Sequence, residues 1–192
     1  MAWQPPTVGS RPVAVLGAGV LGRRIACSFI AGGYNVNIYD LSPASLQDAA
    51  DYVQAHADEF AAFRPSNSGN YGTCNVFDDL SASAKDAWLV VEAIPERIEL
   101  KVDVFGKLDS ICPPDCILGS NSSSYRSSLM VGKVSDERRR LVCNIHYTMP
   151  PQIRTVELMT AGQTHPEVFS FLEDVLRGCG MIPATAVKES TG

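Results

Sequence analysis

Three glycines near the start of the chain have the spacing that a nucleotide-binding turn requires. Gly17, Gly19 and Gly22 fit the pattern G-x-G-x-x-G, directly after a short valine-rich run and at the start of a helical pattern. In that context the first glycine makes a tight turn, the second lets the backbone approach a pyrophosphate, and the third lets helix and strand pack closely. The exposed amides at the helix start, those of Val20 and Leu21 among them, then hold the diphosphate. The alternative is a strand-to-helix turn that uses glycine only for its geometry.

An acidic residue, Asp40, ends the next predicted strand, 18 residues beyond Gly22. A carboxylate at this place hydrogen-bonds both hydroxyls of a ribose and repels a 2′-phosphate, so the sequence favours NAD over NADP. Arg23 and Arg24 are the opposing signal, because two cations close to the phosphates could bind a 2′-phosphate instead. We interpret them as solvated residues of the first helical turn, and an NADP enzyme stays the alternative.

A histidine and an acid could provide acid–base chemistry. His146 follows an apolar run, and Glu157 lies 11 residues later. Histidine titrates near neutrality and needs a partner that orients its ring, which a carboxylate can supply, and the hydroxyls of residues 122–124 add polar groups at the same edge. The sequence therefore predicts His146 as a general base. The other two histidines, His56 and His165, are expected to be solvated surface residues.

These groups require an open sheet that brings them to one edge. Short apolar runs alternate with helical patterns from residue 11 onward, which indicates an α/β domain: a Rossmann-like, doubly wound, mostly parallel sheet with helices on both faces. Loops after the carboxyl ends of such strands meet at one edge, where ligands bind. Strands are predicted at 11–17, 34–40, 88–94, 116–119, 141–145, 155–159 and 182–187, and helical stripes at 20–30, 46–60, 98–108 and 168–175. Residues 63–72 are predicted as a surface loop, and residues 1–10 as a tail before a domain of residues 11–192.

Charge and hydropathy exclude several classes of protein. Sixteen Lys and Arg against 21 Asp and Glu give a net charge of −5 in 192 residues, without the basic excess of a nucleic-acid-binding protein. No run approaches the ~18 apolar residues of a membrane-spanning helix, and the first ten residues lack the pattern of a signal peptide, so we expect a cytoplasmic protein. The six cysteines are scattered and are expected to be free thiols. Cys112 and Cys116 have no second pair and no nearby histidine, so no metal site is predicted.

Four motifs occur in a characteristic order. They are the G-x-G-x-x-G turn, V-E-A-I-P-E at 91–96, S-N-S-S-S at 120–124, and H-Y-T-M-P-P at 146–151 with a later V-E. Together they resemble the NAD-binding domain of the L-3-hydroxyacyl-CoA dehydrogenase family, which includes the lambda-crystallin/L-gulonate 3-dehydrogenase branch. The resemblance runs from about Pro12 to Gly192. It implies oxidation of a secondary 3-hydroxyl to a ketone with hydride transfer to NAD, and a place in fatty acid metabolism.

The resemblance also implies roles for individual residues. His146 takes the hydroxyl proton, Glu157 holds its imidazole and stabilises the cation, and Ser123 hydrogen-bonds the substrate oxygen. Further residues implied to contact the cofactor are Asn121, beside the nicotinamide, and Glu96 and Lys101, which line it.

The sequence departs from the family pattern in four places. Ser122 takes the place of the family's threonine, and Met149 that of its usual asparagine. The spacing from His146 to Glu157 is one residue shorter than in the family. The stretch between Asp40 and Val90 is also short, so the helical excursion of the family is expected to be trimmed to the loop at 63–72.

The last residues, Lys188–Gly192, resemble the family's hinge into a C-terminal helical domain. In the family that domain supplies an active-site asparagine, much of the acyl pocket and the dimer contacts. We therefore expect this chain to be the cofactor half of a homodimeric enzyme, with weak or absent hydride transfer to a CoA ester by itself. Its partner is then a small molecule, a 3-hydroxyacyl-CoA or a related 3-hydroxy acid. The alternative is a dinucleotide-binding sensor or interaction domain without redox turnover, which Met149 and the altered spacing favour.

Overall fold

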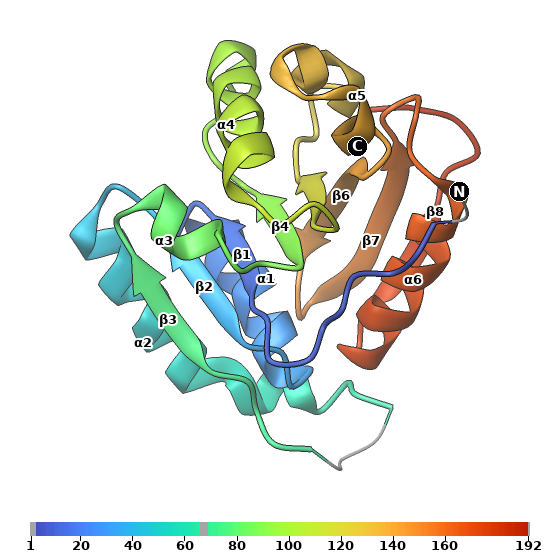
Figure 1. The fold of residues 1–192 in the computed structure, drawn as a ribbon. Coiled ribbons are helices and arrows are strands. Elements are labelled where there is room, and N and C mark those ends of the chain that lie inside the picture. Colours follow the sequence, from blue (N-terminus) through green and yellow to red (C-terminus); the bar gives the residue numbers. More distant parts are fainter. Residues whose placement is uncertain (1–2, 66–68, 192) are drawn as a thin grey trace.

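An eight-stranded sheet runs through the part of the chain that this computed structural model describes, residues 3–65 and 69–191 (Figure 1). Its strands lie in the order β3-β2-β1-β4-β5-β6-β7-β8. Their bounds are β1 (Val13–Leu16), β2 (Val36–Tyr39), β3 (Cys74–Phe77), β4 (Leu89–Glu92), β5 (Ile117–Ser120), β6 (Val142–Met149), β7 (Ile153–Thr160) and β8 (Ile182–Thr185). The order reverses between β1 and β4, which is the doubly wound, Rossmann-like arrangement that the alternating pattern predicted.

Neighbouring strands are parallel except for β6 and β7, which form an antiparallel hairpin. Parallel neighbours need a long crossover, whereas β6 and β7 are joined by residues 150–152 alone and therefore pair directly. This pairing sets His146 opposite Glu157. The hairpin thus fixes the spatial relation of two residues that are 11 positions apart in the chain.

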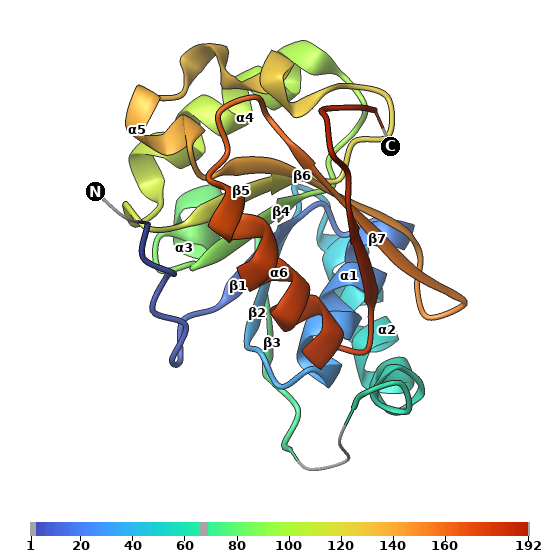
Figure 2. The ribbon, with the colours of Figure 1, turned by 90° about the vertical axis from the view of Figure 1, so that its right-hand side faces the viewer.

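Helices cover both faces of the sheet, as predicted. They are α1 (Val20–Ala31), α2 (Pro43–Ala61), α3 (Leu80–Ala84), α4 (Ile98–Ile111), the 3-10 helix η1 (Ser127–Lys133), α5 (Asp136–Arg139) and α6 (Pro166–Gly178). One apolar layer joins the sheet to α1, α2 and α6 and includes the buried Phe29, Phe60 and Leu172. The other joins it to α3, α4 and η1 and includes Phe105 and Met130. Figure 2 shows α4 and α5 on one side of the sheet and α1, α2 and α6 on the other.

The turn between β1 and α1 needs glycine at two positions for steric reasons. Gly17 has a φ of +102°, and a Cβ there would lie 2.5 Å from the carbonyl oxygen of Ala93. A Cβ at Gly22 would lie 1.8 Å from the carbonyl oxygen of Gly17. A Cβ at Gly19, in contrast, would meet no atom within 4 Å. The first and third glycines of the motif therefore serve the packing of the turn, and the second leaves open space.

Two short elements, β3 and α3, were not predicted from the sequence. The four residues of β3 lie at the sheet edge and are exposed or half-buried, so they form no apolar run. The five residues of α3, LSASA, are too few to show a helical stripe. The strand predicted at 141–145 continues to Met149 through its pairing with β7, so His146 lies within β6 and not after it. Of the loop predicted at 63–72, residues 66–68 lie outside the described residues.

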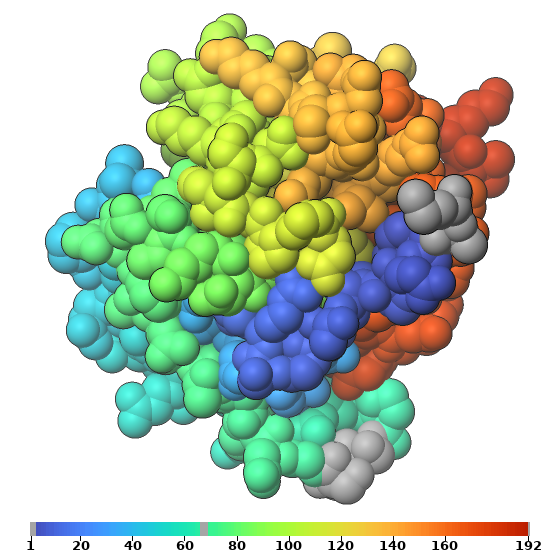
Figure 3. Space-filling model, viewed as in Figure 1, coloured from blue at the N-terminus to red at the C-terminus, as the bar shows by residue number. Residues whose placement is uncertain are grey.

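The N-terminal segment, described from residue 3, packs against the domain. The Trp3 ring meets that of Phe171 in α6 edge to face, with 5.9 Å between centroids. At the base of the sheet, Arg11 donates two hydrogen bonds to Asp115, at 2.7 and 2.9 Å. Figure 3 shows this segment, in dark blue, lying across the viewed face of the molecule.

The six cysteines are free thiols, five of them buried and Cys74 half-buried. Burial raises the pKa of Cys143 and of Cys179 to about 12, so both stay protonated at neutral pH. In residues 3–65 and 69–191, no three His, Cys, Asp or Glu side chains are grouped so that they could hold a metal ion. None of the helices in these two ranges has the length and apolar character needed to span a membrane.

We expect Gly22→Ala to destabilise the chain by about 1–3 kcal/mol, because the added methyl group overpacks the turn against the Gly17 carbonyl. The gain in helix propensity, about 1 kcal/mol or less, is too small to offset this. Gly19→Ala is the matched control, since its methyl group meets no atom within 4 Å. Urea unfolding followed by circular dichroism compares the two. Equal stability of both variants would contradict the close packing at Gly22.

Candidate functional site

The start of α1 forms an open, positively polarised helix end at the carboxyl edge of the sheet. Its N-cap residue, Gly19, has no side chain to occupy the first amides, and the first turn contains no acidic residue. The space in front of Gly19 is free, and Val20 is 55% exposed, with Leu21 packed partly against the core. The helix end therefore has both the partial charge and the room that a diphosphate needs.

Asp40, at the end of β2, is held against this turn. Its Oδ2 accepts a hydrogen bond from the amide of Ala18 at 2.8 Å, and its Oδ1 accepts one from the amide of Ser42 at 2.9 Å. The carboxylate is thus fixed beside the glycine turn, and each oxygen keeps a lone pair for a further donor. This is the position predicted for the residue that binds a ribose.

An apolar cavity of about 280 Å³ opens beside Gly17 and Asp40, between the end of β2 and the start of α4. The apolar side chains in its walls are those of Tyr39, Leu41, Ile94, Pro95, Leu100 and Val104. A flat heteroaromatic base would bury apolar surface in this cavity while its ribose lies at Asp40.

The sequence analysis missed the residues of this cavity, although a signal was present. Leu100 and Val104 are four positions apart in α4 and lie outside the buried stripe that contains Phe105 and Leu108. Apolar residues on a second helical face indicate a further apolar contact. Leu41, directly after Asp40, is 78% exposed and also lines this cavity.

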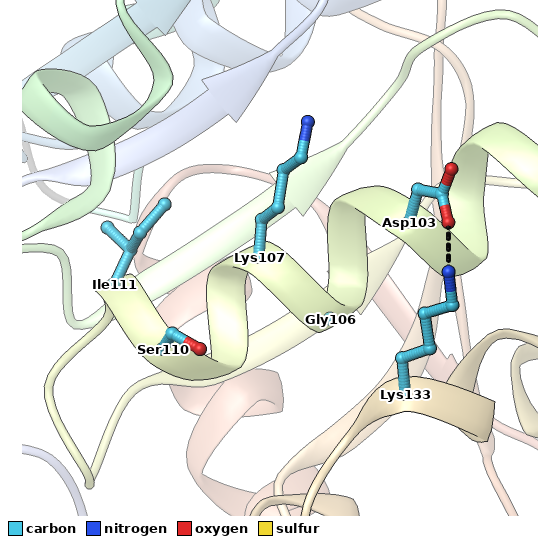
Figure 4. Close-up of a pocket in the computed structure, with 6 residues that line it drawn as sticks. All are labelled: Asp103, Gly106, Lys107, Ser110, Ile111 and Lys133. Carbon is cyan, nitrogen blue, oxygen red and sulfur yellow. Dashed lines mark hydrogen bonds and ion pairs between the residues drawn. The ribbon is translucent and has the colours of Figure 1, made fainter.

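A second hollow, of about 590 Å³, lies on the outer side of α4 against η1 (Figure 4). Its lining residues are Asp103, Gly106, Lys107, Ser110, Ile111 and Lys133. The Lys133–Asp103 ion pair in it measures 2.6 Å and leaves more than half of each side chain exposed, so it contributes little to stability. None of the residues predicted for catalysis or cofactor binding lines this hollow, and we place the functional site at the carboxyl edge.

A buried ion pair lies behind that edge. Lys101 in α4 and Glu92 at the end of β4 are 1% and 0% exposed, with 2.6 Å between Nζ and Oε1. The same ammonium lies 3.0 Å from Oε2 of Glu96, in the loop between β4 and α4. Glu92 also accepts hydrogen bonds from the hydroxyl of Ser120 at 2.7 Å and from the amide of Ile94 at 2.9 Å. These buried charges therefore have the partners that burial demands.

Glu96 connects the ion pair to the serine loop, residues 120–124. It accepts hydrogen bonds from the hydroxyl of Ser122 and from the amide of Ser124, the latter at 3.1 Å. Partial burial by itself would raise the pKa of Glu96, but these hydrogen bonds and the ion pair with Lys101 together lower it. Of the two residues predicted to line the cofactor, Glu96 keeps 36% of its side chain exposed, whereas Lys101 is turned inward to the carboxylates.

His146 and Glu157 face each other across the β6–β7 hairpin. The Nδ1 atom of the histidine lies 2.8 Å from Oε2 of the glutamate. A carboxylate accepts hydrogen bonds, so Nδ1 donates and Nε2 is left free to take a proton. The side chains are 16% and 44% exposed, which leaves the ring shielded but reachable. This is the geometry of a histidine base with an orienting acid.

The serine loop is bonded to β6 on both sides of the histidine. The amide group of Asn144 donates to the carbonyl of Ser122 at 2.9 Å, and the backbone amide of Tyr147 donates to Oδ1 of Asn121 at 2.8 Å. Ser123 follows the two anchored residues, Asn121 and Ser122, and is exposed. The predicted serine and asparagine thus lie in the loop after β5, and the histidine lies within the adjacent strand β6.

Arg23 and Arg24 were expected to be solvated. Both are instead half-buried and lie against α2. Their guanidinium carbons lie 4.8 and 5.4 Å from the ring centroid of Tyr52.

Comparison with known proteins agrees with the geometry. Residues 12–190 match the family model described as 3-hydroxyacyl-CoA dehydrogenase, NAD binding domain. The chain is 27% identical over 186 residues to 5-formyl-3-hydroxy-2-methylpyridine 4-carboxylate 5-dehydrogenase of Mesorhizobium japonicum, a match that covers 95% of this chain and 59% of that protein. It is 28% identical over 186 residues to the lambda-crystallin homolog of Bos taurus, with 94% and 57% covered.

Solved structures give the same result for the fold. The 3-hydroxybutyryl-CoA dehydrogenase from Escherichia coli K12 matches with a TM-score of 0.79 at 26% identity, over 92% of this chain and 38% of that chain. The chain therefore spans between 38% and 59% of the length of these three proteins.

We expect the contribution of Glu96 to stability to be lost in acid. Because its pKa is lower in the folded chain than the ordinary value of 4.5, this carboxylate stabilises the fold above pH 4.5, and the stabilisation disappears as the pH falls through the folded value. Between about pH 7 and about pH 3, the melting temperature of the wild type should therefore fall further than that of Glu96→Gln. Calorimetry measures this, with the exposed Glu99→Gln as the control that should follow the wild type. The same acid sensitivity in Glu96→Gln and the wild type would refute the assignment.

Proposed function

Because the chain belongs to the 3-hydroxyacyl-CoA dehydrogenase family, through the NAD-binding domain that spans residues 12–190, we propose that it is the cofactor half of a dehydrogenase that oxidises a secondary 3-hydroxyl to a ketone. The observation that carries the proposal is the His146–Glu157 pair, 2.8 Å apart, at the sheet edge that also holds the glycine turn. Its substrate is a 3-hydroxyacyl-CoA or a related 3-hydroxy acid. The relative from Mesorhizobium japonicum, named for a 4-carboxylate, supports the inclusion of free acids.

The residues at this edge fit NAD at three points. The open start of α1 offers amides to the diphosphate, Asp40 offers a carboxylate to the ribose, and the apolar cavity of about 280 Å³ accepts the adenine. The fixed negative charge of Asp40 repels a 2′-phosphate. The fit therefore favours NAD over NADP.

The proposed reaction assigns each polar group of the edge one task. When bound, NAD supplies the hydride acceptor. Nε2 of His146 takes the hydroxyl proton, and Glu157 keeps the ring oriented and stabilises the imidazolium that forms. The hydroxyl of Ser123 hydrogen-bonds the substrate oxygen. Asn121, anchored by the amide of Tyr147, lies beside the nicotinamide.

A further domain completes the substrate site in this proposal. The chain spans at most 59% of the length of the three relatives, and the surface near the base is open. Glu157 is 44% exposed, and Met149 and Ile153 at the end of the hairpin are 40% and 52% exposed. We expect this chain alone to transfer hydride slowly and the whole protein to dimerise through the further domain.

A dinucleotide-binding protein without turnover is the second candidate. It is favoured by Met149, which stands at the hairpin end where the family pattern has asparagine, and by the exposure of Glu157. An acid in contact with solvent holds its histidine less firmly than a shielded one.

We expect His146 to matter for turnover and not for cofactor binding. His146→Gln should leave the NADH dissociation constant within about twofold and slow the oxidation of NADH by acetoacetyl-CoA at least ~100-fold, because it removes the proton donor and acceptor. Fluorescence titration and the absorbance of reduced nicotinamide measure the two effects, with His165→Gln as control. Absence of NADH binding would refute the dehydrogenase proposal. Binding of NADH without turnover in the wild type would favour the binding protein, and equal turnover in both variants would refute His146 as the base.

Asp40 should set the preference between the two nicotinamide dinucleotides. Asp40→Ala removes hydrogen bonds to the ribose and the charge that repels a 2′-phosphate, so the ratio of NADH to NADPH affinity should fall at least ~10-fold. Asp48→Ala, an exposed acid in α2, should leave the ratio unchanged. Competition titrations with both cofactors provide the ratio. If Asp40→Ala has the same ratio of NADH to NADPH affinity as the wild type, the carboxylate does not distinguish the two riboses.

A further inference from the structure

Two adjacent arginines of α1 lie against one aromatic side chain of α2. The guanidinium carbons of Arg23 and Arg24 are 4.8 and 5.4 Å from the centroid of the Tyr52 ring. Tyr52 itself stacks on His56, with 4.1 Å between ring centroids and an angle of 12°. All four side chains are half-buried. The stack holds both guanidinium groups in place while leaving part of each in contact with solvent.

Neither positive charge is neutralised. The ion pairs among residues 3–65 and 69–191 include neither arginine. Arg24 donates from Nη1 to two uncharged oxygens, the carbonyl of Pro150 at 2.6 Å and Oε1 of Gln152 at 2.9 Å. The Nε atoms of both arginines are buried without a hydrogen-bond partner. Two like charges that are partly removed from water repel each other, and a tyrosine ring compensates only part of this cost.

The position of the pair separates it from the ribose site. Tyr52 lies nine residues into α2, about 14 Å along the helix from its start beside Asp40. The hydrogen bond to Pro150 places Arg24 at the turn of the β6–β7 hairpin instead. Pro150 follows His146 by four residues, about 13 Å along an extended strand. The arginines therefore lie at the turn of the hairpin, apart both from His146 and from the group that distinguishes NAD from NADP.

We propose that Arg23 and Arg24 form a binding site for an oxyanion, a carboxylate or a phosphate, on the part of the substrate that is remote from its reacting carbon. Guanidinium groups bind such oxygens in pairs, and the anion supplies the charge that the protein does not. This inference rests on the proposed function, because it takes the ligand to extend from His146 along the hairpin. It narrows the substrate class to molecules with a negative group some distance from the 3-hydroxyl.

Titration calorimetry with three probes tests the proposal: NADH, coenzyme A as the phosphate probe, and 3-hydroxybutyrate as a small carboxylate probe that can occupy the arginine pair without reaching His146. The proteins are the wild type, the double variant Arg23→Gln/Arg24→Gln, and Arg140→Gln as a matched loss of one exposed charge at the end of α5. We expect the double variant to bind coenzyme A or 3-hydroxybutyrate at least ~10-fold more weakly, with NADH affinity within about twofold of the wild type. Arg140→Gln should match the wild type for all three probes.

A single variant guards against loss of the fold. Arg23 donates no side-chain hydrogen bond among the described residues, so Arg23→Gln removes only its charge and its contact with Tyr52. It should still lower the affinity for the anionic probe at least ~3-fold. Thermal melting checks that each variant is folded. A loss confined to coenzyme A identifies a phosphate site, and a loss confined to 3-hydroxybutyrate identifies a carboxylate site.

Three results would overturn the inference. The anionic probes could bind the variants as tightly as the wild type, or neither probe could bind the wild type at about 10 mM. In the third, the variants lose as much affinity for NADH as for the anionic probes, which would assign the arginines to the cofactor. Failure of NADH to bind the wild type would instead refute the proposed function. The comparison of anionic probes would still decide the role of the arginines.

Discussion

The buried ammonium of Lys101 is the constraint on which the rest of the site depends. A cation that is 1% exposed needs its carboxylates at contact distance, and breaking such a pair costs about 3–5 kcal/mol. Glu92 belongs to β4 and Glu96 to the following loop, so the lysine ties a helix, a strand and a loop to one point. None of these segments can move far without leaving a buried charge alone.

From this point the order of the site follows by short steps. Glu96 holds the serine loop, the serine loop is bonded to β6 on both sides of His146, and β6 is paired with the strand that carries Glu157. The groups proposed for proton transfer are therefore mounted on strands and on a loop that buried charges hold in place. The glycine turn and the apolar cavity differ from this hydrogen-bonded network. Both are open, and they present backbone amides and apolar surface to a ligand.

Local patterns predicted those parts of the fold that local sequence decides. The strand, glycine turn and helix from Val13 to Ala31 carry their own signals, and so do the apolar strands β4 and β5. The edge strand β3 could not be predicted, because its stability comes from pairing with β2 and not from an apolar run. Alternation also fails to encode the direction of β7, for which the short connection at 150–152 was the available sign. For the site, the motifs predicted which residues gather at the edge, but the inward turn of Lys101 depends on burial, which no spacing reveals.

The antiparallel hairpin has a consequence for how this chain can vary. In parallel neighbours a long crossover separates the paired strands in the chain, whereas here residues 150–152 alone join them and the ladder sets His146 against Glu157. The pairing is irregular between Tyr147 and Met149, between the acid–base pair and the turn. Residues can therefore be lost or gained at the tip of the hairpin without a change in the acid–base pair, provided that the ladder below it keeps its alignment. A deletion there is expected to leave His146 and Glu157 paired, while a slip of one position within the strands would turn the glutamate to the opposite face.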